Sequence, residues 1–181
     1  MTTATARDLL LDAADRMELT EEGWVEKVVL ADAGNMDHRL SAYLVRRGVP
    51  DDWVLKNTRL TSRLVGPKVV WYAPDAMVVL PDNPVRWTGS GEYPGVPDLV
   101  VEVLGTTRSE RDKDKREKKR NYAAVGVPVY WIAEPADGTV QCLELPAGQN
   151  GAPAGGRTYR EVWTGKLTDC PLPAGPGWRL P

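Results

Sequence analysis

Short apolar runs, separated by charged or proline-rich segments, indicate the secondary structure of this chain. Apolar side chains at helical spacing predict two helices in the first half, over residues 4–17 and 37–47. Runs rich in Val, Leu, Trp and Tyr predict strands over residues 22–30, 53–55, 69–72, 76–80 and 99–104. Residues 81–97 contain several prolines and glycines and predict a loop.

The second half continues with a charged helix from about residue 109 to 125, which Gly126 ends. Residues 129–133 predict another buried strand, and residues 139–145 and 157–163 predict a C-terminal β-hairpin. The central order of strand, strand, helix and strand favours an α/β fold, with a mixed central sheet flanked by helices.

Composition limits the classes of protein that fit. A length of 181 residues suits a single domain over residues 1–181, and 42% hydrophobic with 27% charged residues is typical of a soluble one. A net charge of −2 excludes a protein that coats nucleic acid through its overall charge, so contact with DNA requires a local basic patch. No apolar stretch approaches the ~20 residues that span a bilayer, and the N-terminus lacks a signal pattern, so we expect a cytoplasmic protein without membrane contact.

The few potential zinc ligands are scattered. Cys142 and Cys170 are far apart in the sequence and there is no second cysteine pair. A zinc site built on them is therefore not expected, and reduced thiols are the simplest interpretation. His38, the only histidine, lies at the start of a predicted helix, where a capping or surface position is expected rather than a metal-binding one.

The most informative residue is Glu102, which interrupts the apolar run 99–104. A strand of this composition is buried on both faces, and a carboxylate there loses hydration worth several kcal/mol unless a cation or hydrogen-bond donors replace it. Asp98 lies on the same face, four residues before Glu102 on the strand, so their Cα atoms are about 13 Å apart. That distance is too great for the two carboxylates to share one ion.

Asp75 is a better neighbour for Glu102, because it directly precedes the strand predicted over residues 76–80. If this strand pairs with the 99–104 strand, Asp75 faces Glu102 across a gap of about 5 Å. Two carboxylates this close repel each other, so a divalent cation is the natural third group. Oxygen ligands suit Mg²⁺ or Mn²⁺ better than zinc.

The predicted helix after Glu102 carries eight basic and four acidic residues between positions 108 and 120. Asp114, Lys118 and Tyr122 are spaced four residues apart and share one helical face. An inward lysine on that face could reach the metal site, position a water and offset charge on a phosphate. The remaining cations would form a surface that binds the DNA backbone: Arg108, Arg111, Lys115, Arg116 and Lys119.

The segments PDLVVEVLG, DKREK and YAAVGVPVYWIAEP, with YAPDAMVV upstream, resemble the restriction-endonuclease-like family called Uma-two. That family is a branch of the PD-(D/E)xK nuclease superfamily, and the resemblance covers about residues 70 to 135. It implies that Asp75 is the first acid and Glu102 the second. Many superfamily members have a lysine two residues after the second acid, where this chain has Leu104. In the Uma-two family a helical lysine four residues before a tyrosine takes that role, and Lys118 fits this position.

The resemblance implies a Mg²⁺- or Mn²⁺-dependent endonuclease that hydrolyses DNA phosphodiester bonds. Asp75, Glu102 and the backbone carbonyl of Val103 would hold the ion, and Lys118 would orient the attacking water. Nucleases that cut both strands often act as dimers, so a homodimer is consistent with the resemblance. The resemblance also implies that the segment between Gly105 and Tyr122 is about two residues longer here than is usual in the family.

Structural roles are the alternatives for each of these residues. Glu102 could pair with a buried arginine or with backbone amides, and Asp75 and Asp98 could cap turns next to their prolines. Lys115, one turn before Lys118, is its rival, and Tyr122 could serve packing alone. The basic run could form a solvated face of i, i+4 ion pairs.

Two other functions compete with an active nuclease. A catalytically degenerate protein that keeps the fold and binds nucleic acid or a protein partner is the main alternative, because Leu104 stands where a lysine is usual. A metal-dependent hydrolase of a smaller phosphoester is the third.

Overall fold

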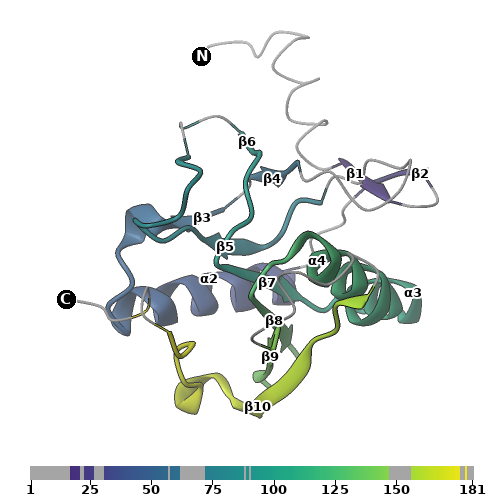
Figure 1. Ribbon diagram of the computed structural model, residues 1–181. Helices are drawn as coiled ribbons and strands as arrows, with labels where there is room; N and C mark the ends of the chain where they lie inside the picture. Colours follow the sequence, from purple (N-terminus) through teal and green to yellow (C-terminus); the bar gives the residue numbers. More distant parts are fainter. Residues whose placement is uncertain are drawn as a thin grey trace, which may run out of the picture.

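A computed structural model describes residues 17–20, 23–26, 31–56, 58–61, 72–87, 89, 91–146, 156–175 and 178. Its centre is a six-stranded sheet with the strand order β10-β9-β8-β7-β5-β3 (Figure 1). The strands are β3 (Val54–Leu55), β5 (Ala76–Val78), β7 (Leu99–Val103), β8 (Val129–Glu134), β9 (Thr139–Glu144) and β10 (Arg160–Lys166). β7 and β8 run parallel, and the other neighbours are antiparallel. The predicted mixed sheet is therefore confirmed.

A helical crossover joins the two parallel strands, as parallel pairing requires. It consists of α3 (Arg108–Asp112), a π-helical turn (Lys113–Lys118) and α4 (Lys119–Val125). Thr107 and Glu110 form a capping box at its start, and Gly126, with φ of 92°, ends it in a left-handed conformation that favours glycine. The helix predicted here is present, but a π turn interrupts it.

Helix α2 (Ala31–Arg46) covers one face of the sheet. Its inward residues Leu40 and Leu44 are fully buried and pack against alternate strand residues such as Val101 and Trp131. Gly48, with φ of 96°, follows the end of the helix in a left-handed conformation that favours glycine. The helix begins earlier than the predicted residue 37, because apolar spacing locates the buried stripe and not the first turn.

The crossover packs on the opposite face of the sheet, over the other alternating set of strand residues. That set includes Met77, Val100 and Ile132, which pack with Tyr122 of α4. Glu102 lies two residues after Val100 on β7, so its side chain points to the same face of the sheet. The carboxylate therefore lies between the sheet and the crossover, where it is 1% exposed.

Two further strand pairs lie outside the main sheet. β1 (Met17–Thr20) pairs with β2 (Gly23–Glu26) as an antiparallel hairpin. β4 (Arg59–Leu60) pairs with β6 (Glu92–Tyr93) in parallel.

Some sequence predictions differ from these elements. The strand predicted over 22–30 begins at Gly23, and β1 was not predicted. The predicted 81–97 loop contains β6, since a two-residue strand is too short to show alternation. The predicted helix over 4–17 lies outside the described residues except for Met17, which begins β1. Residues 27–30 and 69–71 also lie outside them.

Candidate functional site

Asp75 and Glu102 lie opposite each other at one end of the antiparallel pair β5 and β7. Ala76 is in register with Val101, so the next pair along the ladder is Asp75 and Glu102. Asp75 Oδ2 accepts a 2.6 Å hydrogen bond from the Val103 backbone N–H, which fixes this carboxylate against the end of β7. The strand pairing on which the predicted acid pair depended is thus present.

Lys118 lies at the centre of a group of carboxylates. Its ammonium Nζ is 3.0 Å from Glu102 Oε2, 3.1 Å from Asp114 Oδ1 and 3.1 Å from Glu18 Oε1. An ammonium group has three N–H donors, so each one is matched by a carboxylate oxygen. With only 3% of its side chain exposed, Lys118 is held by these contacts in one position beneath the surface.

Glu18 is the member of this cluster that the sequence did not reveal. It lies on β1, is 2% exposed, and contacts Lys118 through Oε1 and the Nζ of Lys113 through Oε2, at 2.5 Å. Oε1 also accepts a 3.3 Å hydrogen bond from the backbone N–H of Ala73, two residues before Asp75. Glu18 therefore ties the hairpin, the crossover and the segment that leads into β5 together.

Tyrosine hydroxyls complete the site. Tyr122 donates a 2.6 Å hydrogen bond to Glu102 Oε1, and Tyr130 donates to the backbone carbonyl of Asp114 at 3.0 Å. The rings of Tyr72, Tyr122 and Tyr130 stack edge to face with centroids 5.5 and 5.2 Å apart. These rings exclude water, while their hydroxyls satisfy groups that water would otherwise solvate.

The buried charges shift one another's ionisation. Burial alone would lower the pKa of Lys118, but the negative charges of Glu102, Glu18 and Asp114 raise it well above its usual value. Burial raises the pKa of Asp114, and the attraction of Lys118 only partly opposes this effect. Burial and the neighbouring Glu102 raise the pKa of Tyr122 far above its usual range. Lys118 is therefore a cation and Tyr122 a neutral donor around neutral pH.

The carboxylate and carbonyl oxygens near Asp75 are suitable ligands for a hard divalent cation. Because a strand residue directs its N–H and C=O to the same side, and the Val103 N–H points to Asp75, the Val103 carbonyl faces that side too. Two carboxylates and a carbonyl are the oxygen donors that Mg²⁺ and Mn²⁺ prefer. Within the described segments, no three acidic, histidine or cysteine side chains are grouped so that they could hold a metal ion by themselves.

The secondary candidates separate into two groups. Asp114 and Tyr122 lie in the cluster, whereas Asp98 and Lys115 lie elsewhere. Asp98 Oδ2 accepts hydrogen bonds from the Leu80 backbone and the Asn83 side chain at 2.8 and 2.9 Å, which is the geometry of a turn cap. Lys115 is exposed and lines a cavity of about 250 Å³ that Leu104, Ile132 and Glu134 also line.

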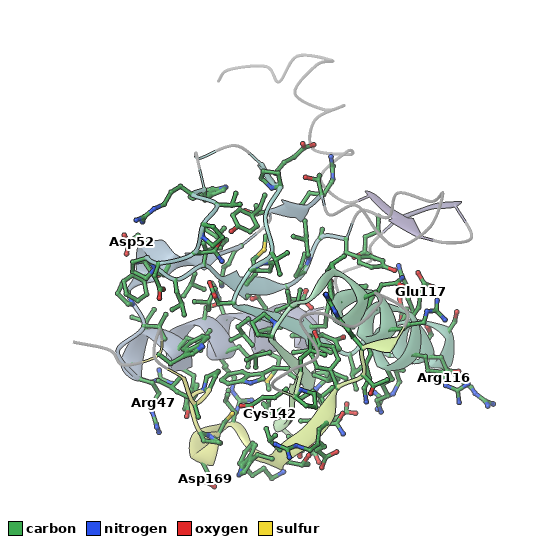
Figure 2. All side chains as sticks on the ribbon, viewed as in Figure 1. Arg47, Asp52, Arg116, Glu117, Cys142 and Asp169 are labelled. Atoms are coloured by element: carbon green, nitrogen blue, oxygen red, sulfur yellow. The ribbon has the colours of Figure 1, made fainter. Side chains whose placement is uncertain are left out.

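The basic residues predicted to contact DNA are only partly available for it. Arg111 pairs with Glu134, and Arg108 with Asp112 at 3.8 Å. Lys115 and Arg116 are exposed, Lys119 is half-buried, and Figure 2 shows Arg116 extending away from the crossover.

The cysteines and the histidine lie away from the carboxylates. Cys142 and Cys170 come together in the fold as buried free thiols with sulfur atoms 3.4 Å apart, on the α2 face of the sheet. His38 is exposed and lines a cavity of about 400 Å³ with Arg39 and Arg46.

Sequence reasoning found Asp75, Glu102 and Lys118 but missed Glu18 and Lys113. Glu18 lies in a short hairpin whose sequence, MELTEEGWVE, contains several acids with no pattern that separates one from the others. Lys113 was one of eight cations in the crossover segment, and only the π turn distinguishes it.

The fold resembles a solved structure. A crystal structure titled as a putative nuclease belonging to DUF820, from Anabaena variabilis, superimposes with a TM-score of 0.54. The match covers 78% of this chain and 80% of the other, at 14% sequence identity, so it supports the shared fold. None of the curated proteins compared with the chain matches it.

The sequence also matches the model of one protein family. Residues 9–168 match the family Uma2, described as "Putative restriction endonuclease". No helix in the described segments has the length and apolar character to cross a bilayer. The cytoplasmic location and the homodimer stay predictions.

Proposed function

The chain belongs to the Uma2 family, and from this membership and the carboxylate–lysine cluster we propose that it is a divalent-metal-dependent endonuclease that hydrolyses DNA phosphodiester bonds. The observation that carries the proposal is the contact between Lys118 Nζ and Glu102 Oε2 at 3.0 Å, next to Asp75, whose carboxylate accepts from the N–H of the residue after Glu102. A buried lysine next to two opposed acids is costly to maintain, so a chemical role explains it better than packing does.

Lys118 acts as a fixed positive charge. Its pKa is raised well above the usual value by the three carboxylates, so it stays protonated and cannot accept a proton at neutral pH. A protonated ammonium group can instead orient a water through an N–H donor and stabilise negative charge that develops on a phosphate. Burial strengthens both effects, because the surroundings screen the charge less than water does.

Asp75, Glu102 and the Val103 carbonyl are the groups that would hold the metal. A bound Mg²⁺ or Mn²⁺ would supply Lewis acidity at the phosphate and a more acidic water. Tyr122 fixes the orientation of Glu102, and the Val103 N–H fixes Asp75, so neither carboxylate needs to reorganise on binding. The two acids thus form a preorganised pair.

Cleavage of supercoiled plasmid DNA by the purified protein tests the proposal. We expect cleavage in Mg²⁺ or Mn²⁺ that EDTA abolishes, and a rate at least about 10²-fold lower for Glu102→Gln and Asp75→Asn. The matched control is Glu144→Gln, which alters a half-buried glutamate on β9 outside the cluster. Equal cleavage in EDTA, or full activity of Glu102→Gln, would contradict the proposal.

One observation favours the second candidate, a degenerate nuclease fold that binds DNA without cutting it. All three N–H donors of Lys118 are matched by carboxylates, so orienting a water requires one of these contacts to be exchanged. Binding of labelled DNA without cleavage in either metal would support this candidate over the first.

A further inference from the structure

Two lysines, not one, meet at the carboxylate cluster. The carboxylate of Glu18 bridges them, with Oε1 3.1 Å from Lys118 Nζ and Oε2 2.5 Å from Lys113 Nζ. Their surroundings differ, because the side chain of Lys118 is 3% exposed and that of Lys113 is 21% exposed. Lys113 is therefore the cation on the solvent side of the cluster.

The π-helical turn explains how both lysines reach Glu18. They are five residues apart, and in a regular α-helix this spacing separates two side chains by about 140° around the axis. The π turn spans Lys113–Lys118, and its hydrogen bonds join residues five apart, which brings these two positions onto one side. A π turn also takes up one residue more than an α turn, so it accounts for one of the about two extra residues expected in this segment.

The two ammonium groups differ in how many of their N–H donors contact carboxylates of the cluster. Lys118 directs its three N–H groups to three carboxylates. Within the described part of the chain, Lys113 has one such partner, Glu18, so two of its N–H donors are not used by these residues. A phosphate that approaches from solvent would meet these donors before it could reach Lys118.

We infer that Lys113 contacts the substrate phosphate directly, while Lys118 supplies positive charge from beneath the carboxylates. This inference rests on the proposed action on DNA and adds a division of roles between the two lysines. If Lys113 only neutralised Glu18, its removal would take away no phosphate contact, and the slope of the salt dependence would change by much less than one contact requires. A direct contact would instead contribute one phosphate to the salt dependence of binding.

The experiment measures the binding of a fluorescein-labelled DNA duplex by anisotropy over a range of KCl concentrations. The buffer contains Ca²⁺, a cation that also takes carboxylate ligands, and a gel verifies that the duplex stays intact. For Lys113→Met we expect weaker binding and a plot of log K against log[KCl] that is less steep by about 0.9. Lys113→Arg, which keeps the charge, should restore the slope.

Lys56→Met is the matched control. Lys56 is another half-buried lysine paired with a carboxylate, Asp37, at 3.5 Å, and 28% of its side chain is exposed. It lies beside α2 and outside the cluster, so this variant should keep the wild-type slope. Thermal unfolding of each variant verifies that it is folded. In cleavage assays, Lys113→Met should raise KM more than it lowers kcat.

The outcomes separate the inference from the proposed function. Suppose that the wild type cleaves DNA and that folded Lys113→Met has the same slope and KM as the wild type. This result would overturn the inference about Lys113 but not the proposed function. If the wild type binds DNA without cutting it, the proposed nuclease activity is contradicted. The slope of log K against log[KCl] would still decide whether Lys113 contacts a phosphate. A wild type that neither binds nor cuts DNA would overturn both.

Discussion

The two faces of the central sheet are built from different kinds of side chain. The face under α2 is packed mainly with aliphatic residues and Trp131, and its one tyrosine, Tyr43, donates to the carbonyl of Cys170. The face under the crossover contains or contacts five of the six tyrosines of the chain, and it surrounds Glu102, Asp114 and Lys118. Both faces are thus packed with apolar residues, but only the face under the crossover adds a cluster of buried charges.

This difference shows how one central sheet can carry a costly polar cluster. Burial of apolar surface under α2 stabilises the fold without polar groups that need partners. The tyrosines of the other face have apolar rings with a hydroxyl at the end, so they exclude water and still donate hydrogen bonds to charged groups. We therefore expect stability and activity to respond separately to substitutions on the two faces.

Removal of Lys118 should have the largest effect, because it leaves Glu18, Glu102 and Asp114 buried without their common cation. We expect Lys118→Met to lose about 3–5 kcal/mol of unfolding free energy at neutral pH, and kcat to fall by about 10²-fold or more. Urea unfolding and plasmid cleavage, corrected for the folded fraction, measure the two losses.

The stability lost in Lys118→Met should depend on pH with a defined sign. Burial raises the folded-state pKa of Asp114 above its ordinary value of 3.8, and the variant removes the attraction that opposes this rise. A raised pKa makes protonation favour the folded state, so stability declines as pH rises through that pKa. As the pH falls from about 7 to about 4, the unfolding free energy of the variant should therefore approach that of the wild type. An equal deficit at both pH values would contradict this explanation.

On the α2 face, Leu40→Ala should lower the unfolding free energy by about 3 kcal/mol, because a fully buried leucine leaves a cavity. Its deficit relative to wild type should not vary with pH in the acid range, since no ionisable group is exposed or freed. Activity per folded molecule should match wild type. A large loss of kcat in folded Leu40→Ala would show that the two faces are coupled.

Tyr122→Phe should have the smallest effect of the three. It removes the donor 2.6 Å from Glu102 Oε1 and keeps the ring, so we expect a loss of about 2 kcal/mol in stability. Activity should fall less than in Lys118→Met, because Lys118 still contacts the other oxygen of Glu102. Urea unfolding and initial cleavage rates measure both effects, and a stability equal to wild type would show that water replaces the hydroxyl.

The sequence predicted those parts of the molecule that depend on local pattern. The two strands around Asp75 and Glu102 follow from apolar runs, whereas their pairing was only assumed from the sequence and is present in the structure. The spacing of Asp114, Lys118 and Tyr122 likewise set them on one helical face, and all three lie in the cluster. Apolar runs and the four-residue spacing were sufficient to select these residues as candidates.

Other parts depend on contacts between distant segments, which no local pattern records. Glu18 becomes important only because its hairpin packs beside the crossover, and its own sequence neighbours are ordinary. Lys113 reaches Glu18 through a π turn that α-helical periodicity does not predict. The extra length of the segment before Tyr122 gives neither the position nor the type of this turn.

The position of Glu18 has a consequence for protein synthesis. Glu18 and Lys113 meet across 95 residues of sequence, and Lys118 joins the same carboxylate five residues later. A ribosome releases the chain from its N-terminus, so a nascent chain contains Glu18 long before it contains either lysine. The cluster can therefore assemble only after β3, β5 and β7, three of the six strands of the main sheet, have been synthesised. Nascent chains that end before Lys113 therefore lack both lysines of the cluster, and under the proposed function they would not cut DNA.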